Sequence, residues 1–201
     1  MAAGVAGLLL TGGASRRMGR DKAGLRLAPD GTSLSSHLAG LLSSCCEPVI
    51  EVGEGRSGLV HVSDSPRLGP LGAVSAGRAA LSSAGFAGPA LVLATDLALV
   101  SASLLAALAG HPADRSLSVV PVVGGRLQPL CARWSPAALD LAASLVAAGE
   151  RRAQAAFSDE AGFLALDCSD LGDFDLAREL EDVDEPADLS RLGLAEGPPG
   201  S

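Results

Sequence analysis

The 201-residue sequence contains no tyrosine, one tryptophan and only four phenylalanines. Proteins that bind single-stranded nucleic acid stack the bases on aromatic side chains, and this chain has too few of them to build such a platform. The formal net charge of −8 also excludes a surface that coats nucleic acid, because a phosphate backbone requires a basic face. Any bound base must therefore be held largely by backbone groups and aliphatic side chains.

Long apolar runs are also missing, since none reaches the roughly 20 residues that a membrane helix needs. The N-terminus lacks the basic flank, apolar stretch and cleavage site of a secretory signal. A hydrophobic content of 48% with only 19% charged residues is typical of a folded domain. We therefore expect a cytoplasmic protein without membrane association. The spacing of the four cysteines matches no zinc motif and indicates buried free thiols, at Cys45, Cys46, Cys131 and Cys168.

Short apolar runs alternate with segments of helical periodicity, which predicts an α/β fold. We expect a single-domain, Rossmann-like three-layer sandwich with a mostly parallel sheet and a small antiparallel hairpin, turning at Gly124-Gly125. The predicted strands are residues 5–10, 48–52, 59–63, 90–95, 117–123, 126–133 and 163–168. The predicted helices are residues 33–44, 69–83, 101–109, 136–148 and 185–192. The domain is expected to span residues 1–194, with residues 195–201 as a flexible C-terminal tail.

The most informative segment follows the first strand, where Gly12-Gly13 leads into a cluster of cations between Arg16 and Lys22. A buried strand delivers the chain to the carboxyl edge of the sheet, where open α/β folds bind ligands. Paired glycines let the backbone turn and approach a ligand closely, and consecutive amides there can form an anion-binding nest. Arg17 can clamp phosphate oxygens in a bidentate manner, and Lys22 adds a mobile point charge.

This loop is neither of the two commonest nucleotide-binding loops. A dinucleotide fingerprint needs Gly-x-Gly-x-x-Gly, whereas Gly12 and Gly13 are adjacent. A P-loop needs Gly-Lys followed by Ser or Thr, whereas Gly19 is followed by Arg20. The remaining alternative is a solvated basic loop after a strand, against which the ordered series of glycines, serine, arginines and lysine argues.

Residues 12–22 closely resemble the signature loop of the molybdenum cofactor guanylyltransferases, within the wider nucleotidyltransferase family that also makes nucleotide sugars. The resemblance implies that the loop wraps the triphosphate of a nucleotide and that Arg17 and Lys22 act in catalysis by contacting its phosphates. The nucleotide-binding residues implied in this segment are Leu10, Gly12, Gly13, Ser15, Arg17 and Lys22. The adjacent glycines resemble those of the family's GTP-dependent members, and the missing Cβ at Gly12 leaves room for a purine ring.

The resemblance continues downstream to Leu192 and implies further site residues. Asp64 ends a strand near the nucleotide, although it could instead cap the turn at Ser65-Pro66. The segment Gly69-Pro70-Leu71-Gly72 resembles one that lies against the base and ribose. Asp96 matches the catalytic strand-end aspartate that binds Mg²⁺, a cation that prefers oxygen ligands. Five residues separate it from the helix at Ser101, too far for a simple N-cap.

Other matches to the family concern the acceptor side. Gln128 corresponds to a polar residue facing the acceptor, or it is ordinary sheet surface. Arg151 and Arg152 resemble a guanylyltransferase segment that could contact the acceptor phosphate, or they are exposed arginines. The sequence departs from the family where Asp182 and Asp184 replace asparagines, because an ionised aspartate cannot donate a hydrogen bond to a phosphate. Asp184 could equally cap the last helix. A second departure is Ala98, where a proline usually follows the Mg²⁺ aspartate.

The resemblance implies transfer of GMP from GTP to the terminal phosphate of molybdopterin (molybdenum cofactor), with Mg²⁺ as cofactor and pyrophosphate as product. Two alternatives stay open. One is a cytidylyltransferase or another nucleotidyltransferase with a different small phosphorylated acceptor, and the other is a non-catalytic nucleotide-binding homologue. We expect a monomer that makes transient contact with cofactor-biosynthesis proteins or molybdoenzymes.

Overall fold

Four parallel strands form the part of the sheet that carries the N-terminal loop. The computed structural model describes residues 4–12, 26–27, 32–159, 161–172, 174–182 and 194–195. Strand β1 (Ala6–Leu10) lies between β3 (Val49–Val52) and β5 (Ala90–Ala94), and β4 (His61–Val62) pairs with β3. Every residue of β1 and β5 is buried, as expected for parallel strands that are covered on both faces.

The rest of the sheet is mixed. Strand β8 (Cys131–Trp134) runs antiparallel between β5 and β6 (Ser118–Val123). Strand β6 also pairs with β7 (Arg126–Leu127) across the predicted hairpin and with β9 (Phe163–Leu166) in parallel. The strand order is β4-β3-β1-β5-β8-β6-β7, with β9 also on β6. The α/β class and the hairpin are thus confirmed. A separate two-stranded pair joins β2 (Arg26–Leu27) to β10 (Leu194–Ala195).

One strand prediction is wrong: residues 126–133 do not form a single strand. The chain leaves the sheet between β7 and β8, where Gln128 N donates to the Pro121 carbonyl and Cys131 N donates to the Gln128 carbonyl. Pro129 has no amide to donate to a ladder, and its carbonyl accepts a hydrogen bond from Trp134 Nε1 at 2.8 Å. This turn carries the chain from β7, on one side of β6, to β8, which lies between β6 and β5.

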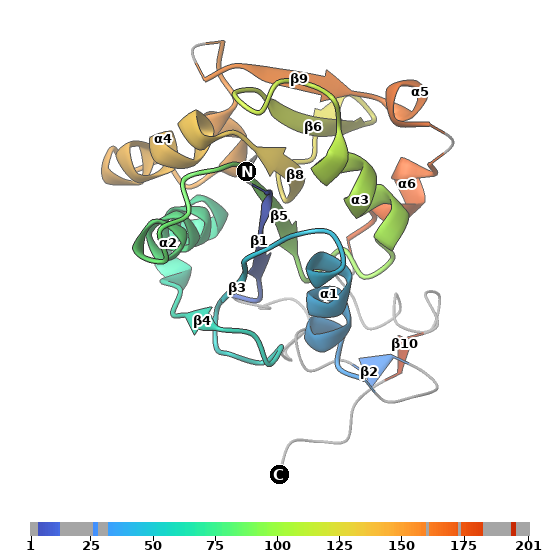
Figure 1. The fold of residues 1–201 in the computed structure, drawn as a ribbon, viewed down its shortest axis with the longest axis horizontal. Helices are drawn as coiled ribbons and strands as arrows, with labels where there is room; N and C mark the ends of the chain where they lie inside the picture. The colour runs from blue at the N-terminus through green and yellow to red at the C-terminus, as the bar shows by residue number, and fades with distance from the viewer. Residues whose placement is uncertain are drawn as a thin grey trace.

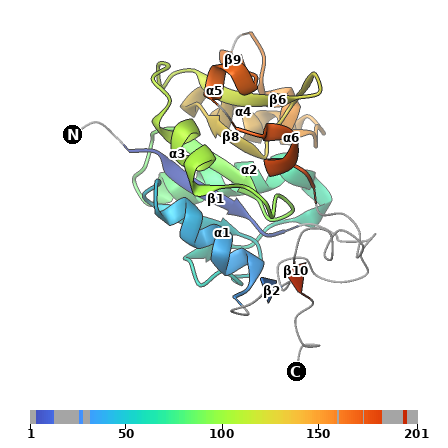
Figure 2. The same ribbon diagram turned by 90° about the vertical axis from the view of Figure 1, so that its right-hand side faces the viewer.

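Four long helices cover the two faces of the sheet (Figure 1). Helices α2 (Gly69–Ser83) and α4 (Pro136–Ala147) pack on one face, and α1 (Leu34–Ser43) and α3 (Ala102–Gly110) pack on the other, as Figure 2 also shows. Residues of β1 alternate between the two hydrophobic cores, with Leu8 facing α2 and Leu9 facing α1. The sheet thus forms the middle layer of the predicted sandwich.

Local chemistry explains where these helices begin. Ser33, Ser101 and Ser135 are N-caps whose hydroxyl oxygens each accept an amide hydrogen bond from the first turn. Pro136 occupies the first turn of α4, where its missing amide costs nothing. The predicted helices at these positions are therefore confirmed to within one or two residues at each end.

Shorter elements complete the described chain. They are the 3₁₀ helices η2 (Pro66–Leu68) and η3 (Ala153–Ala156), and the helices α5 (Cys168–Leu171) and α6 (Leu176–Glu179). Cys168 therefore opens α5, capped by Asp167, and does not end the strand as predicted. The predicted helix 185–192 and residues 196–201 of the predicted tail lie outside the described residues, whereas Ala195 pairs with Arg26.

All four cysteines are described and are free thiols, but the predicted burial is confirmed only for Cys46 and Cys131. Cys46 and Cys131 are buried, Cys45 is half-buried and Cys168 is exposed, because it lies on the short surface helix α5. Within the described ranges, no helix combines the length and apolarity that a bilayer crossing requires.

Candidate functional site

The carboxyl ends of the four parallel strands meet at one edge of the sheet. Backbone hydrogen bonds continue the ladder there: Thr11 N donates to the Val52 carbonyl at 3.0 Å, and Thr95 N donates to the Leu10 carbonyl at 3.1 Å. Gly53 N likewise donates to the Val62 carbonyl at 2.9 Å. The residues that follow β1, β3, β4 and β5 are thus held at the edge where open α/β sheets bind ligands.

Gly12 lies directly against Asp64 at this edge. A Cβ at Gly12 would collide with the Asp64 carboxylate, so a glycine is required for the close approach. Asp64 Oδ1 is buried and has no hydrogen-bond partner within the described part of the chain. Burial raises the pKa of Asp64, and the amide hydrogen bond from Ser65 opposes this only in part. Asp64 therefore contacts the strand-end residue Gly12, and its role beside the nucleotide stays a prediction.

Asp96 follows β5 and is half-buried at the same edge. The N-cap of α3 is Ser101, whose Oγ accepts from Leu104 N at 3.1 Å, so Asp96 does not cap this helix. Thr95 is tied to β1 twice, since its amide and its Oγ1 both donate to the Leu10 carbonyl. The β5 strand end is therefore fixed against the strand that carries Gly12.

These carboxylates suit a magnesium ion. Mg²⁺ is commonly held by one or two carboxylates, together with water and the phosphate oxygens of a substrate. Asp64 offers an unpartnered buried oxygen, and Asp96 offers a second carboxylate at the same edge. No group of three or more His, Cys, Asp or Glu side chains that could hold a metal occurs within the described ranges, and a Mg²⁺ site of this kind does not need one.

The start of α2 is built from the predicted segment 69–72. Gly69 has φ +65°, and a Cβ there would lie 3.1 Å from the Arg151 carbonyl, so glycine is required at the junction of η2 and α2. Gly72 packs on Leu68 so closely that a Cβ would collide with it. Leu71 is fully buried in the core, whereas Pro70 is exposed. Gly69 and Pro70 are therefore the accessible part of this predicted nucleotide-binding segment.

The arginines predicted on the acceptor side pack next to this junction. The Arg151 guanidinium donates to the carbonyls of Arg67, Val146 and Glu150, and the Arg151 carbonyl accepts from Leu71 N at 3.3 Å. Arg152 is exposed and forms an ion pair with Glu150 at 2.9 Å. Arg151 therefore ties the chain after α4 to the start of α2, and Arg152 is the more accessible of the two.

Gln128 lies between β7 and β8, and the start of β8 adjoins the carboxyl end of β5, because Cys131 pairs with Leu93 and Ala94 N donates to the Leu130 carbonyl at 2.9 Å. Gln128 follows β7, and its Nε2 donates weakly to the Arg126 carbonyl at 3.4 Å. Five predicted residues, Gly13, Ser15, Arg17, Lys22 and Asp184, lie outside the described residues. The described part of the site thus consists of Leu10, Gly12, Asp64, Asp96 and the segment 69–72.

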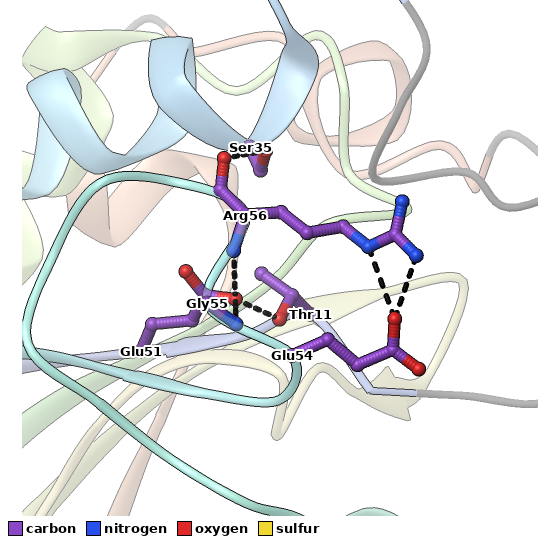
Figure 3. A network of polar contacts seen from close by, with 6 residues as sticks. All are labelled: Thr11, Ser35, Glu51, Glu54, Gly55 and Arg56. Atoms are coloured by element: carbon purple, nitrogen blue, oxygen red, sulfur yellow. Dashed lines mark hydrogen bonds and ion pairs between the residues drawn. The ribbon is translucent and has the colours of Figure 1, made fainter. Parts of the chain in front are cut away.

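A buried carboxylate that the sequence analysis missed lies beside Gly12. Glu51 is fully buried in β3, and Figure 3 shows its carboxylate between Thr11 and the loop that follows β3. Thr11 Oγ1 donates to Glu51 Oε1 at 2.6 Å. The other donors are in the loop: Gly55 N and Arg56 N at 2.9 Å, and Ser57 N at 2.8 Å together with Ser57 Oγ. Burial alone would raise the pKa of Glu51, but these hydrogen bonds outweigh it and hold that pKa below its usual value.

A comparison with known proteins identifies the family. Residues 7–162 match the MobA-like NTP transferase domain. The chain belongs to this family. The matched range includes Gly12, Asp64, Asp96 and the 69–72 segment, so the carboxyl edge lies within the shared domain.

Relatives with assigned names are similar to this chain over most of its length. A "Probable molybdenum cofactor guanylyltransferase" of Mycobacterium bovis is 36% identical over 157 residues, which cover 75% of this chain and 78% of the relative. One of the same name from Mycobacterium ulcerans is 34% identical over 187 residues, covering 89% and 92%. The crystal structure of molybdopterin-guanine dinucleotide biosynthesis protein A from Archaeoglobus fulgidus is 21% identical, with a TM-score of 0.74 and coverage of 93% and 96%. The Archaeoglobus structure shares the fold of this chain. The family match and the mycobacterial relatives show that the chain is a nucleotidyltransferase.

A signal for Glu51 was present in the sequence. An acidic residue stands inside an apolar strand, and such a residue is rarely buried without partners. The glycine-containing segment 53–58 follows at once and can turn its amides toward the carboxylate. The distant partner Thr11, 40 residues earlier, has no such local signal.

Proposed function

We propose that this family member transfers GMP from GTP to the terminal phosphate of molybdopterin in the molybdenum cofactor. The similarity to the two mycobacterial relatives supports this proposal, because both carry that activity in their names and one of them covers 89% of the chain. The observation that carries it is the placement of Gly12, Asp64 and Asp96 at one edge of the sheet. That placement matches the strand-end glycine and carboxylates that the resemblance implies.

The reaction joins two phosphate groups. An oxygen of the acceptor's terminal phosphate attacks the α-phosphorus of GTP, and a new P–O–P linkage forms. The bond from the α-phosphorus to the β-bridging oxygen breaks, and pyrophosphate leaves with the electron pair. Such chemistry depends on in-line positioning and on offsetting negative charge, and it needs no covalent nucleophile from the protein.

The chain's own residues supply the positioning and part of the charge. Asp96 would hold Mg²⁺ at the end of β5, and the buried Asp64 oxygen, which has no partner among the described residues, lies at the same edge beside Gly12. When bound, the ion would neutralise charge on the triphosphate. Arg17 and Lys22 would contact the phosphates, and the backbone at Gly12 and Gly13 would accommodate the guanine nucleotide. Gly69 and Pro70 would lie against the base and ribose.

The acceptor and the cellular setting complete the proposal. Arg152 is exposed beside the start of α2 and is the better placed of the two arginines to meet an acceptor phosphate. We expect the enzyme to act in the cytoplasm as a monomer. Its product would pass to molybdoenzymes through transient contacts.

Pyrophosphate release with Mg²⁺ and molybdenum cofactor tests the proposal, with GTP, CTP, ATP and UTP compared at equal concentration. We expect rapid release with GTP alone. Release with CTP or another nucleotide would support nucleotidyl transfer but contradict the proposed preference for guanine. Binding of GTP without release from any nucleotide would reject this acceptor and point to another one or to a non-catalytic homologue.

A further inference from the structure

Glu51 is a fully buried carboxylate that the proposed reaction does not use. Its two oxygens accept five hydrogen bonds: Oε1 accepts from Thr11 Oγ1, Gly55 N and Arg56 N, and Oε2 accepts from Ser57 N and Ser57 Oγ. Three of the donors are consecutive backbone amides, so the carboxylate determines the course of the loop at residues 53–57. A buried charge is tolerated in a core strand only when it is satisfied in this way.

The same loop packs on the strand end that carries Gly12. A Cβ at Gly53 would collide with Thr11 Oγ1 and would lie 3.1 Å from Gly12 N. Gly12 in turn lies against the Asp64 carboxylate. The backbone at Gly12 is therefore enclosed between the loop after β3 and the turn after β4, and Glu51 holds the first of these in place through bonds to both Thr11 and the loop (Figure 3).

We propose that Glu51 is a positioning residue for the nucleotide, because its ionised carboxylate sets the loop 53–57 and the Thr11-Gly12 backbone in the conformation that receives the nucleotide. This inference rests on the proposed function, since it assigns Glu51 to the nucleotide side of that reaction. Both Glu51 oxygens accept hydrogen bonds from the protein itself, so we assign the carboxylate no direct contact with substrate or metal. It acts through Thr11 and through the backbone of the loop.

The position of Asp96 indicates that a change at Glu51 affects nucleotide binding more than the chemical step. Asp96 follows β5, on the opposite side of β1 from β3, and the hydrogen bonds from Thr95 to Leu10 hold that strand end without Glu51. Disturbing Glu51 should therefore weaken binding of the nucleotide and leave the chemical step largely intact. A residue with only a structural role would instead lower the fraction of active enzyme and would leave KM unchanged.

Glu51→Gln is the decisive variant. Its amide can keep one oxygen facing Thr11, Gly55 and Arg56, but its NH₂ group then faces the Ser57 amide donor. Ser57→Ala is a milder second variant, because it removes the hydroxyl that donates to Glu51 and accepts from Leu59 N, but it keeps the three backbone amide bonds to Glu51. Glu47→Gln is the matched control, since it neutralises an exposed carboxylate at the opposite end of the same strand.

The experiment measures KM for GTP, kcat and KM for the acceptor, with backbone hydrogen exchange at residues 53–57 and a thermal melt for each variant. For Glu51→Gln we expect the KM for GTP to rise about tenfold or more, since the loss of one charge-assisted hydrogen bond corresponds to about a tenfold loss of affinity. We expect kcat within about twofold of wild type and faster exchange of the loop amides. Ser57→Ala should change KM in the same direction by a few-fold, and Glu47→Gln should change nothing.

Two results would overturn the inference. One is a KM for GTP in Glu51→Gln equal to that of Glu47→Gln while the wild type is active. The other is an unchanged exchange rate at residues 53–57. If Glu51→Gln does not fold, Ser57→Ala decides, and an unchanged KM there overturns the inference. Failure of the proposed function differs, because the wild type itself would then turn over no GTP, and the role of Glu51 would fall with it.

Discussion

Two carboxylates at the same edge of the sheet have pKa values shifted in opposite directions. Burial raises the pKa of Asp64, which keeps one oxygen without a partner among the described residues. Glu51 is buried more completely, yet its five hydrogen bonds outweigh the burial and lower its pKa. A nearby cation would lower the pKa of Asp64 again, whereas the Glu51 carboxylate is already satisfied by its hydrogen bonds. The hydrogen-bond partners, and not burial alone, therefore decide in which direction each pKa is shifted.

At the residue scale, we predict that Asp96→Ala or Lys22→Ala lowers the rate of pyrophosphate release by roughly 10²-fold or more, because each removes charge stabilisation from the reacting phosphates. Asp96 is half-buried at a strand end, so the melting temperature should stay within a few degrees of wild type. Arg17→Lys should also slow the reaction, since the bidentate fork is lost. Turnover assays and thermal melts check this.

Glu47→Ala is the control for the Asp96 variant, because it deletes an exposed carboxylate at the opposite edge of the sheet. It should retain full activity. Wild-type activity in Asp96→Ala or Lys22→Ala would remove that residue from the proposed site.

At the element scale, the junction of η2 and α2 is held by close backbone contact. Gly69 takes a left-handed conformation against the Arg151 carbonyl, and the Arg151 guanidinium donates to the Arg67 carbonyl just before it. Contacts between residues more than 80 positions apart thus set where α2 begins. The same helix carries Gly69 and Pro70 to the edge that holds Asp64.

Gly69→Ala should destabilise the protein by about 1–2 kcal/mol, since a left-handed conformation costs an L-residue about that much. Gly40→Ala is the matched change in α1, where the added Cβ meets nothing within 4 Å, and it should stabilise the protein by about 0.5–1 kcal/mol. Urea denaturation of both variants measures the free energy of unfolding. Equal effects of the two changes would show that the junction at Gly69 imposes no strain.

At the scale of the whole molecule, one continuous sheet connects the two cores. Strand β8 joins the parallel strands to β6 and β9, and buried Arg133 in β8 donates to the carbonyls of Ala109, His111, Ala113 and Asp114 in and after α3. Trp134, the single tryptophan, is fully buried beside Phe157, with ring centroids 4.7 Å apart. Its fluorescence therefore reports on the middle of the molecule.

We predict that Trp134 fluorescence and far-ultraviolet circular dichroism follow the same transition in urea, because the cores on the two faces share every central strand. Both probes should give one midpoint and one slope. An earlier fluorescence transition would mean that β6, β8 and β9 unfold separately from the parallel strands.

The order of the described strands and helices and the positions of Asp64 and Asp96 at strand ends could be predicted from the sequence, whereas the loop from Gly13 to Lys22 lies outside the described residues. Each depends on patterns within a few residues: burial of a whole strand, a serine cap before a helix, or glycine at a turn. Residues 126–133 were misread because β8 runs between β5 and β6, and only the strand order of the whole sheet decides that position.

Only the tertiary structure decided which polar groups meet across the chain. Glu51 reaches Thr11 because β1 and β3 pair in a register that places Leu10 beside Val52, and Gly12, after β1, reaches Asp64, after β4, across the intervening strand β3. Hydrogen bonding and close packing act over a few ångströms in space, whereas sequence patterns extend only over neighbouring positions in the chain. The sequence by itself thus determined most of the elements and their order along the chain, and strand pairing determined how the residues around Gly12 are held.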